Sequence, residues 1–360
     1  MKIAFIAHND YPITKACTGY NDRFMLRLIE SLKQEGIKVL LFAQEGSQVD
    51  CELYSFHTHS VDWQYDDEVS STQKKEVEDQ HAYAEAFQLL ATSDVDVVHN
   101  FSLHSWPIYT AQFLPMPSLT VLSKKPLALL QSAVKLNSHS HSYYVSPTYY
   151  FKSLWESYTP INEVIYQGVD TVKWKFRNAY EEKQLIYWGP IERSGKLDEL
   201  IKVCQENGWK LWIVGEITNK AYFEYMIQSS LNTAIVYLGD LAEEQVVPYL
   251  GSAQAAVFLD EKSTTPENIL KSLSCGTPVS CIAHERFMEY VPASCGSLIY
   301  DLTKETLKQA IVDSLQKDRK DCRSFIEGNF TVQQGVDTYQ LLYQKIINQF
   351  QANKKVNAYS

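Results

Sequence analysis

The sequence predicts an α/β protein with two successive domains, each built on a parallel sheet. Short apolar runs typical of buried strands alternate with amphipathic helical patterns along most of the chain. The first unit has a strand at 2–7, a helix at 21–35 that ends at Gly36, and a strand at 37–43. Such a strand–helix–strand unit implies parallel strands. The 360 residues fit two domains of ordinary size better than a single core.

The first domain continues this alternation less regularly. A polar, helix-prone segment occupies 66–92, and a buried strand is predicted at 95–99. Further strands are predicted at 119–122, 142–145 and 164–166.

The second domain shows the alternation more clearly, after a charged stretch at 177–183 that we interpret as a linker. Apolar runs predict strands at 184–188, 210–214, 234–238, 255–259 and 277–282. Helical patterns follow these strands at 196–207, 221–231, 243–250 and 266–275. Amphipathic helices at 304–317 and 333–351 close the chain.

The composition indicates a globular protein, with 45% hydrophobic and 21% charged residues. The formal charge of −10 argues against nucleic-acid binding and against stable docking on anionic lipid, although a local basic patch stays compatible with it. The seven cysteines include no C-x-x-C pair, which favours reduced thiols over disulfides or zinc ligands. We expect no signal peptide, no stable membrane insertion and a cytoplasmic location, because the apolar stretch at the N-terminus is short.

Three loops that follow predicted strands are candidate ligand sites, because ligands of doubly wound sheets lie at the carboxyl ends of strands. The first is 8–22, where Gly19 allows close approach of the backbone to a ligand. The second is 187–196, where Arg193 and Lys196 flank a glycine at a helix start and could hold a diphosphate. An ordinary loop and a solvated surface turn are the alternatives for these two segments.

The third loop leads into the helix at 266–275. Thr265 is a predicted N-cap and Pro266 takes the favoured first position, while Gly276 fits the end of the helix. The free amides at this helix start, near Glu267, could hold a phosphate.

The histidines do not predict a metal site, since no cysteine or carboxylate pattern completes one. His99 follows a buried strand and is the histidine best placed to meet a substrate, with a core histidine as the alternative.

Together these segments resemble the family-4 retaining glycosyltransferases of the GT-B fold. The motifs are DVVH at 96–99, VIYQGVD at 164–170, the strand and loop at 185–196, WIVG at 212–215, YLG at 237–239, SCGTPV at 274–279 and Glu289. Their order and spacing match the family over most of the chain, most clearly from 164 to 291.

The resemblance implies two Rossmann-like domains facing across a cleft. An acceptor domain would occupy 1–168 and a donor domain 184–330, with a closing helix in 331–360 that returns towards the N-terminal domain. It also implies transfer of a sugar from a nucleoside-diphosphate sugar to a hydroxyl acceptor with retention. The nucleotide sugar would be a co-substrate, and neither a further cofactor nor a metal would be needed.

The chain departs from the family pattern on both the donor and the acceptor side. Ser263 and Lys271 replace two glutamates, and an ammonium cannot accept hydrogen bonds from ribose hydroxyls as the second glutamate does. Pro190 replaces an arginine, and the lysine–glycine pair is reversed at 195–196. Ser123 stands where a histidine is common.

Two hypotheses follow. In the first, the chain is an active transferase with a rearranged site, in which His99 is the catalytic candidate on the acceptor side. Its donor-binding residues are Gly19, Arg193, Lys196, Thr265, Glu267, Glu285 and Glu289. In the second, it is a catalytically degenerate relative that binds a glycan, a nucleotide or a partner protein. A nicotinamide dehydrogenase is disfavoured, because no G-x-G-x-x-G follows the first strand.

Overall fold

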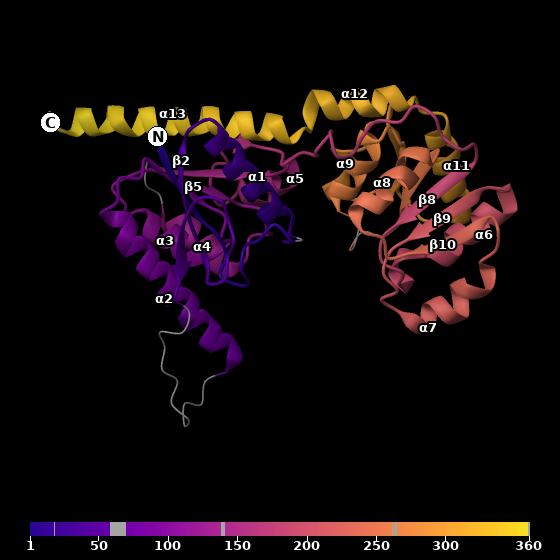
Figure 1. Cartoon of the computed structure of the whole chain (residues 1–360), viewed down its shortest axis with the longest axis horizontal. Helices are drawn as coiled ribbons and strands as arrows, with labels where there is room; N and C mark the ends of the chain where they lie inside the picture. The colour runs from indigo at the N-terminus through magenta and orange to yellow at the C-terminus, as the bar shows by residue number, and fades with distance from the viewer. Residues whose placement is uncertain (18, 58–69, 138–140, 261, 263–264, 359–360) are drawn as a thin grey trace. The chain divides into compact units, whose positions relative to one another are not determined.

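The computed structural model describes residues 1–17, 19–57, 70–137, 141–260, 262 and 265–358. The chain forms two compact units, one made of Met1–Gln167 with Gly335–Ser360 and the other of Gly168–Gln334 (Figure 1). Each unit is built on its own parallel sheet with helices on both faces. None of the described helices is long and apolar enough to cross a bilayer.

Unit 1 has a seven-stranded sheet in the order β3-β2-β1-β4-β5-β6-β7, in which every pair is parallel. Its strands are β1 (Lys2–Ile6), β2 (Lys38–Gln44), β3 (Glu52–Phe56), β4 (Val97–Asn100), β5 (Ser118–Val121), β6 (Ser142–Ser146) and β7 (Glu163–Val164). Its helices are α1 (Tyr20–Gln34), α2 (Ser71–Ala91), α3 (Ser105–Ala111), α4 (Ala128–Leu136), α5 (Tyr149–Trp155) and most of α13 (Val332–Ala358).

Alternate residues of the apolar strand β1 face two different helix layers. Ala4 and Ile6 belong to a core with Tyr83 and Phe87 of α2. Phe5 contacts the ring of His99 on the opposite face. There α1 and α13 supply the covering side chains, including Phe24 and Tyr339, whose rings are 5.7 Å apart.

Unit 2 has a six-stranded parallel sheet in the order β10-β9-β8-β11-β12-β13. Its strands are β8 (Gln184–Trp188), β9 (Lys210–Val214), β10 (Ile235–Gly239), β11 (Ala255–Phe258), β12 (Val279–Ile282) and β13 (Gly296–Ile299). Its helices include α6 (Leu197–Asn207), α7 (Lys220–Tyr222), α8 (Glu243–Ser252), α9 (Pro266–Ser274), α10 (Glu285–Met288), α11 (Lys304–Leu315) and α12 (Arg319–Asn329). Helices α6 and α11 share a core with the sheet.

Several segments differ from the sequence prediction. The helix predicted at 221–231 is broken into the short α7, a π-helical turn at Phe223–Ile227 and a 3₁₀ turn at Gln228–Ser230. Residues 177–183 lie within unit 2, where the guanidinium of Arg177 donates to Ser252 Oγ. Residues 66–69 of the helix predicted at 66–92 lie outside the described residues.

Arg319, at the start of α12, holds the ends of several unit 2 segments together. Its guanidinium is buried and donates to four carbonyl oxygens, those of Arg177, Gly251, Ala253 and Cys275, at 2.7–3.2 Å. Gly251 and Ala253 lie at the end of α8 and Cys275 caps α9, so the cation meets the negative ends of two helices. Burial lowers the pKa of Arg319 to about 10, which still leaves it charged at neutral pH.

We expect Arg319→Leu to lower the free energy of unfolding by about 3 kcal/mol or more, because four buried carbonyls lose their donor. Urea unfolding followed by circular dichroism measures this change. Exposed Lys320 on the same helix gives a matched control, Lys320→Leu, with an expected loss below about 0.5 kcal/mol. A loss below about 1 kcal/mol in Arg319→Leu would show that these carbonyls find other partners.

Candidate functional site

The carboxyl edge of the unit 2 sheet gathers most of the donor-binding residues predicted from the sequence. Strands β8 and β11 are neighbours although two strands separate them in the chain, so the strand order reverses between them. Ligands of doubly wound sheets bind at such a switch point, outside the carboxyl ends of the strands. Arg193 and Lys196 follow β8, Thr265 and Glu267 follow β11, and Glu285 follows β12.

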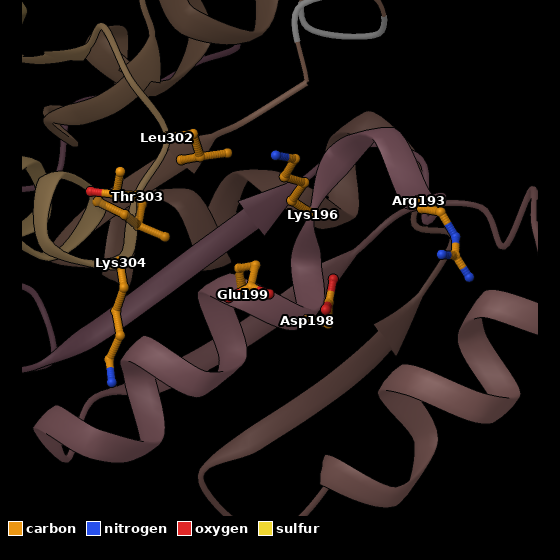
Figure 2. Close-up of a pocket in the computed structure, with 8 residues that line it drawn as sticks. Arg193, Lys196, Asp198, Glu199, Leu302, Thr303 and Lys304 are labelled. Atoms are coloured by element: carbon orange, nitrogen blue, oxygen red, sulfur yellow. The ribbon is translucent and has the colours of Figure 1, made fainter.

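The loop after β8 presents two exposed cations. Arg193 begins a 3₁₀ turn that ends at Gly195, and Lys196 is the N-cap of α6. Both side chains line a pocket of about 350 Å³ between the start of α6 and the start of α11. Figure 2 shows Lys196 on the side of Leu302, whereas the guanidinium of Arg193 points away from both residues. The loop therefore offers two separately directed cations to an anionic ligand.

The reversed glycine–lysine order has a structural consequence. Lys196 adopts φ +44°, in the left-handed region that favours glycine. Gly195 lies against Tyr187, whose hydroxyl would be 2.5 Å from a Cβ at position 195. A side chain at 195 would therefore require the Tyr187 hydroxyl to shift, and the lysine stands at 196 instead, where its backbone is strained.

Asp260 is a site residue that the sequence reasoning missed. It is buried just beyond β11 and accepts hydrogen bonds from the Ser194 hydroxyl and the Lys262 backbone amide, both at 2.8 Å. The carboxylate thus ties the loop after β8 to the loop after β11 across the switch point. The available signal was an acidic residue directly after a buried apolar run.

The start of α9 is capped as predicted. The Thr265 side chain accepts a hydrogen bond from the Asn268 amide, and Pro266 takes the first helical position. Glu267 forms an ion pair with Lys271 at 2.9 Å, with its side chain 14% exposed. The carboxylate predicted to contact the donor is therefore already paired within its own helix. Ser263 lies outside the described residues.

Lys271, which replaces a family glutamate, is at the centre of a charged cluster. Only 4% of its side chain is exposed, and its ammonium lies 5.1 Å and 5.4 Å from the ring centres of Trp174 and Trp188. It pairs with Glu243 of α8 as well as with Glu267. These contacts balance a charge that burial would otherwise make costly.

Glu243 is held ionised by the same cluster. Burial tends to raise its pKa, but hydrogen bonds and charges from Lys173 and Lys271 outweigh burial and lower the pKa to about 2. Lys173 also pairs with Glu244 at 2.8 Å. The charges of this cluster are therefore paired with one another, through side chains of α8 and α9 and through Lys173, which precedes β8.

The remaining donor-side residues surround α10. His284 caps this helix, with its Nδ1 accepting from the Arg286 amide at 3.1 Å. Glu285 is exposed at its first position, and Glu289 is half-buried at its end. They lie beyond the carboxyl end of β12, beside the strand that leads to Thr265.

His99 has the surroundings of a core residue in unit 1. The side chain is fully buried among Phe5, Phe101 and Tyr339, and its Nδ1 lies 2.6 Å from the Tyr343 hydroxyl. Burial lowers the pKa of His99 well below its usual range, so the ring is neutral at pH 7. No surface of the imidazole is open to an acceptor, and the catalytic role assigned from the sequence stays a prediction.

Gly19 lies beyond β1, at the switch point between β1 and β4 of unit 1. It is the N-cap of α1 without a side-chain cap. Asp22 nearby accepts a hydrogen bond from the Tyr11 hydroxyl at 2.7 Å and lies 3.3 Å from His8 Nε2. A Cβ on Gly19 would come within 2.3 Å of the Asp22 carboxylate, so the glycine makes room for this polar cluster.

A second set of polar side chains is linked by hydrogen bonds at the same edge of unit 1. Gln167 donates to Asn21, and Asn21 donates to Ser123, both at 2.7 Å. Ser123, found where the family commonly has a histidine, thus has a defined partner on α1. Within the described residues, no three His, Cys, Asp or Glu side chains gather as metal ligands would.

Comparisons with known proteins agree with this architecture. Residues 169–331 match the family model described as Glycosyl transferases group 1. The sucrose-phosphate synthase structure from Thermosynechococcus elongatus aligns over 97% of this chain and 99% of that chain, with TM-score 0.69 and 14% identity. The fold is that of the GT-B glycosyltransferases.

Two further GT-B-like structures align over nearly their full lengths. The alignment with the lipopolysaccharide outer core galactosyltransferase WaaB covers 98% of this chain and 100% of the WaaB chain, with TM-score 0.67 and 15% identity. HepE from Anabaena, solved with UDP and glucose, covers 96% and 100%, with TM-score 0.63 and 12% identity. A search of curated protein sequences finds no significant match.

We expect Lys196→Gly to be more stable than Lys196→Ala by roughly 0.5–1 kcal/mol, because only glycine relieves the left-handed backbone strain. Both variants lose the ammonium, so the comparison separates backbone strain from charge. Thermal and urea unfolding of the two variants measure the difference. Equal stabilities would mean that residue 196 is not strained in solution.

We expect Glu243→Gln to lower the free energy of unfolding at pH 7 by about 2 kcal/mol, because Lys271 loses one of its two partners. The pKa of Glu243 is depressed in the folded protein, so its stabilisation is present above the usual pKa of 4.5 and is lost as pH falls towards 2. The gap between wild type and variant should therefore shrink below pH 4.5.

Urea unfolding at several pH values tests this expectation. Glu244→Gln is the matched control, because the side chain of Glu244 is 72% exposed and contacts only Lys173 of the two lysines. Its expected effect is much smaller than that of Glu243→Gln, because solvent screens a fully exposed ion pair. A gap for Glu243→Gln that does not change with pH would contradict the ionised pairing.

Proposed function

We propose that the protein transfers a sugar from a nucleoside-diphosphate sugar to a hydroxyl acceptor, with retention of anomeric configuration and without a metal. The glycosyl transferases group 1 match over 169–331 is the observation that carries this proposal, because it covers unit 2 and its switch-point loops. The likeness of the whole chain to HepE, whose structure contains UDP and glucose, supports the same substrate class. The nucleotide sugar is a co-substrate, and no other cofactor takes part.

In this proposal Arg193 and Lys196 hold the diphosphate. Their positive charges stabilise the negative charge that develops on the leaving diphosphate as the glycosidic bond breaks. The Ser194–Asp260 hydrogen bond fixes the loop that carries them. Amides at the start of α9 add donors, while Glu285 and Glu289 contact the sugar.

Retention needs no protein nucleophile in this proposal. A donor phosphate oxygen takes the proton of the acceptor hydroxyl, which attacks from the face that the diphosphate leaves. The protein contributes by positioning the two substrates and by stabilising charge. The acceptor is a glycan or another hydroxyl compound bound by unit 1, and the protein works in the cytoplasm.

Calorimetric titration with UDP, GDP, ADP and their sugars tests the donor site. We expect saturable binding of one nucleotide, weakened at least about tenfold in the double variant Arg193→Ala/Lys196→Ala, which loses two cations. Lys308→Ala/Lys320→Ala, at two exposed lysines of unit 2, removes the same charge elsewhere and should bind as wild type does. Unaltered affinity in the Arg193/Lys196 variant would exclude these residues as the phosphate clamp.

Product analysis tests the chemistry separately. Proton NMR of the product should show the anomeric configuration of the donor, and turnover should persist in the presence of EDTA. An inverted product or loss of turnover on chelation would contradict the proposed mechanism.

The Lys271 cluster favours a second candidate function. At position 271 the family has a glutamate that accepts hydrogen bonds from hydroxyl groups. This chain has a buried lysine there, and its charge is neutralised by Glu243 and Glu267. This arrangement suits a glycosyltransferase-like protein that has lost turnover and acts through a bound glycan or partner protein. Absence of binding by all three nucleotides, in a folded sample, would favour this candidate over the transferase.

A further inference from the structure

Three carboxylates that flank the switch point of unit 2 are already paired with protein groups. Asp260 is buried and accepts two hydrogen bonds, from a serine hydroxyl and from a backbone amide. Glu267 pairs with Lys271, and Glu243 pairs with both Lys271 and Lys173. We call Lys173, Glu243, Glu267 and Lys271 the Lys271 cluster. Its carboxylates have cationic partners before any ligand arrives.

Burial and packing hold the Lys271 ammonium in place. The side chain is only 4% exposed, and the ammonium lies over the rings of Trp174 and Trp188. Hydrogen bonds between charged groups are stronger than those that a neutral hydroxyl forms. A ligand hydroxyl that displaced Lys271 from Glu267 would also leave a buried ammonium with one partner fewer. The Lys271 cluster therefore stays paired when a hydroxyl group approaches.

The Lys271 cluster lies beside the place where a nucleotide would bind. In the proposed function the diphosphate meets the amides at the start of α9, and a nucleoside diphosphate carries its pentose directly on the diphosphate. Glu267 is in the first turn of α9, and Lys271 follows about 6 Å further along the helix axis. Trp188 ends β8, the strand that leads into the loop of Arg193. The pentose hydroxyls would therefore meet carboxylates that lysines already occupy.

We propose that Lys271 keeps the donor site from selecting the 2′-hydroxyl of the pentose. A site rejects an analogue that lacks a hydroxyl when the loss leaves a buried polar group unpaired. In this site the loss leaves Glu243 and Glu267 paired with Lys271. The protein therefore accepts 2′-deoxyribonucleoside-diphosphate sugars as well as ribonucleoside-diphosphate sugars. This inference rests on the proposed function and specifies its donor class.

The other described carboxylates of these loops do not restore selection for ribose. Glu192 and Glu285 keep contact with solvent, so water takes the place of a missing hydroxyl there. Glu289, at the end of α10, contacts the transferred sugar in the proposed function. The half-buried carboxylate that the donor meets is thus on the sugar side and not on the pentose side.

Calorimetric titration of the wild-type protein with matched nucleotides tests the inference. UDP, GDP and ADP are each compared with their 2′-deoxy analogues, so that only one hydroxyl differs within a pair. A hydrogen bond to a charged group contributes about tenfold or more to affinity. For the base that binds, we expect the two dissociation constants to differ by less than about fivefold, because no such bond is lost.

The outcomes separate this inference from the proposed function. A preference for the ribonucleotide of more than about fivefold would overturn the inference and leave the proposed function intact. Absence of binding by all of these nucleotides, in a folded sample, would overturn both.

The variant Lys271→Met tests the role of Lys271 itself. Methionine fills the space beside the two indoles but cannot donate a hydrogen bond to a carboxylate. Because Glu267 is released from its ion pair, we expect the preference for the ribonucleotide to rise to at least about tenfold. Lys173→Met is the matched control, since it removes a lysine of the cluster but leaves both ion pairs of Lys271.

The control should show the wild-type ratio of dissociation constants, and thermal unfolding verifies that both variants fold. Equal ratios in folded Lys271→Met and Lys173→Met would overturn the role of Lys271. Where Lys271→Met does not fold, the wild-type titrations still decide the donor class.

Discussion

The parallel pairing of all strands in each sheet is the constraint on which the candidate site depends. Because every strand of unit 2 runs the same way, the loops that follow β8, β11 and β12 emerge at one edge. The reversal of strand order between β8 and β11 leaves room there for a ligand. Asp260 and Ser194 join the two loops at this reversal, and the cations of the β8 loop are held next to it. The sheet topology thus determines where the candidate site lies, and the side chains determine its charge and hydrogen bonds.

Unit 2 has exposed cations that favour ligand binding, and it also has a charged cluster whose members already pair with one another without a ligand. Arg193 and Lys196 are exposed, and Lys196 keeps a strained backbone that glycine would adopt more easily. Backbone strain of this kind is common at functional positions. By contrast, Lys271 is buried and paired with Glu243 and Glu267. A nucleotide sugar would therefore meet two exposed cations, while the neighbouring carboxylates already have partners.

The sequence predicted the buried strands and two of the four edge strands, β7 and β10. The apolar runs at 2–7 and 184–188 became β1 and β8, because strands covered on both faces must be apolar throughout. The edge strands β3 and β13 were missed, since partly exposed strands carry mixed sequences. The Thr265 cap was predicted because capping is local. The pairing of Lys271 with Glu243 joins residues 28 positions apart, and such contacts leave no periodic signal in a single sequence.

Hydrogen–deuterium exchange with and without the nucleotide that binds most tightly tests the central claim most directly, since it locates the ligand on the chain. Binding at the switch point of unit 2 predicts slower exchange in the loop at 189–196 and at the start of α9, because those amides would be covered or hydrogen-bonded by the diphosphate. Exchange in α4 should not change. Protection confined to other segments, with none in 189–196, would contradict the assignment of the donor site to the loop after β8.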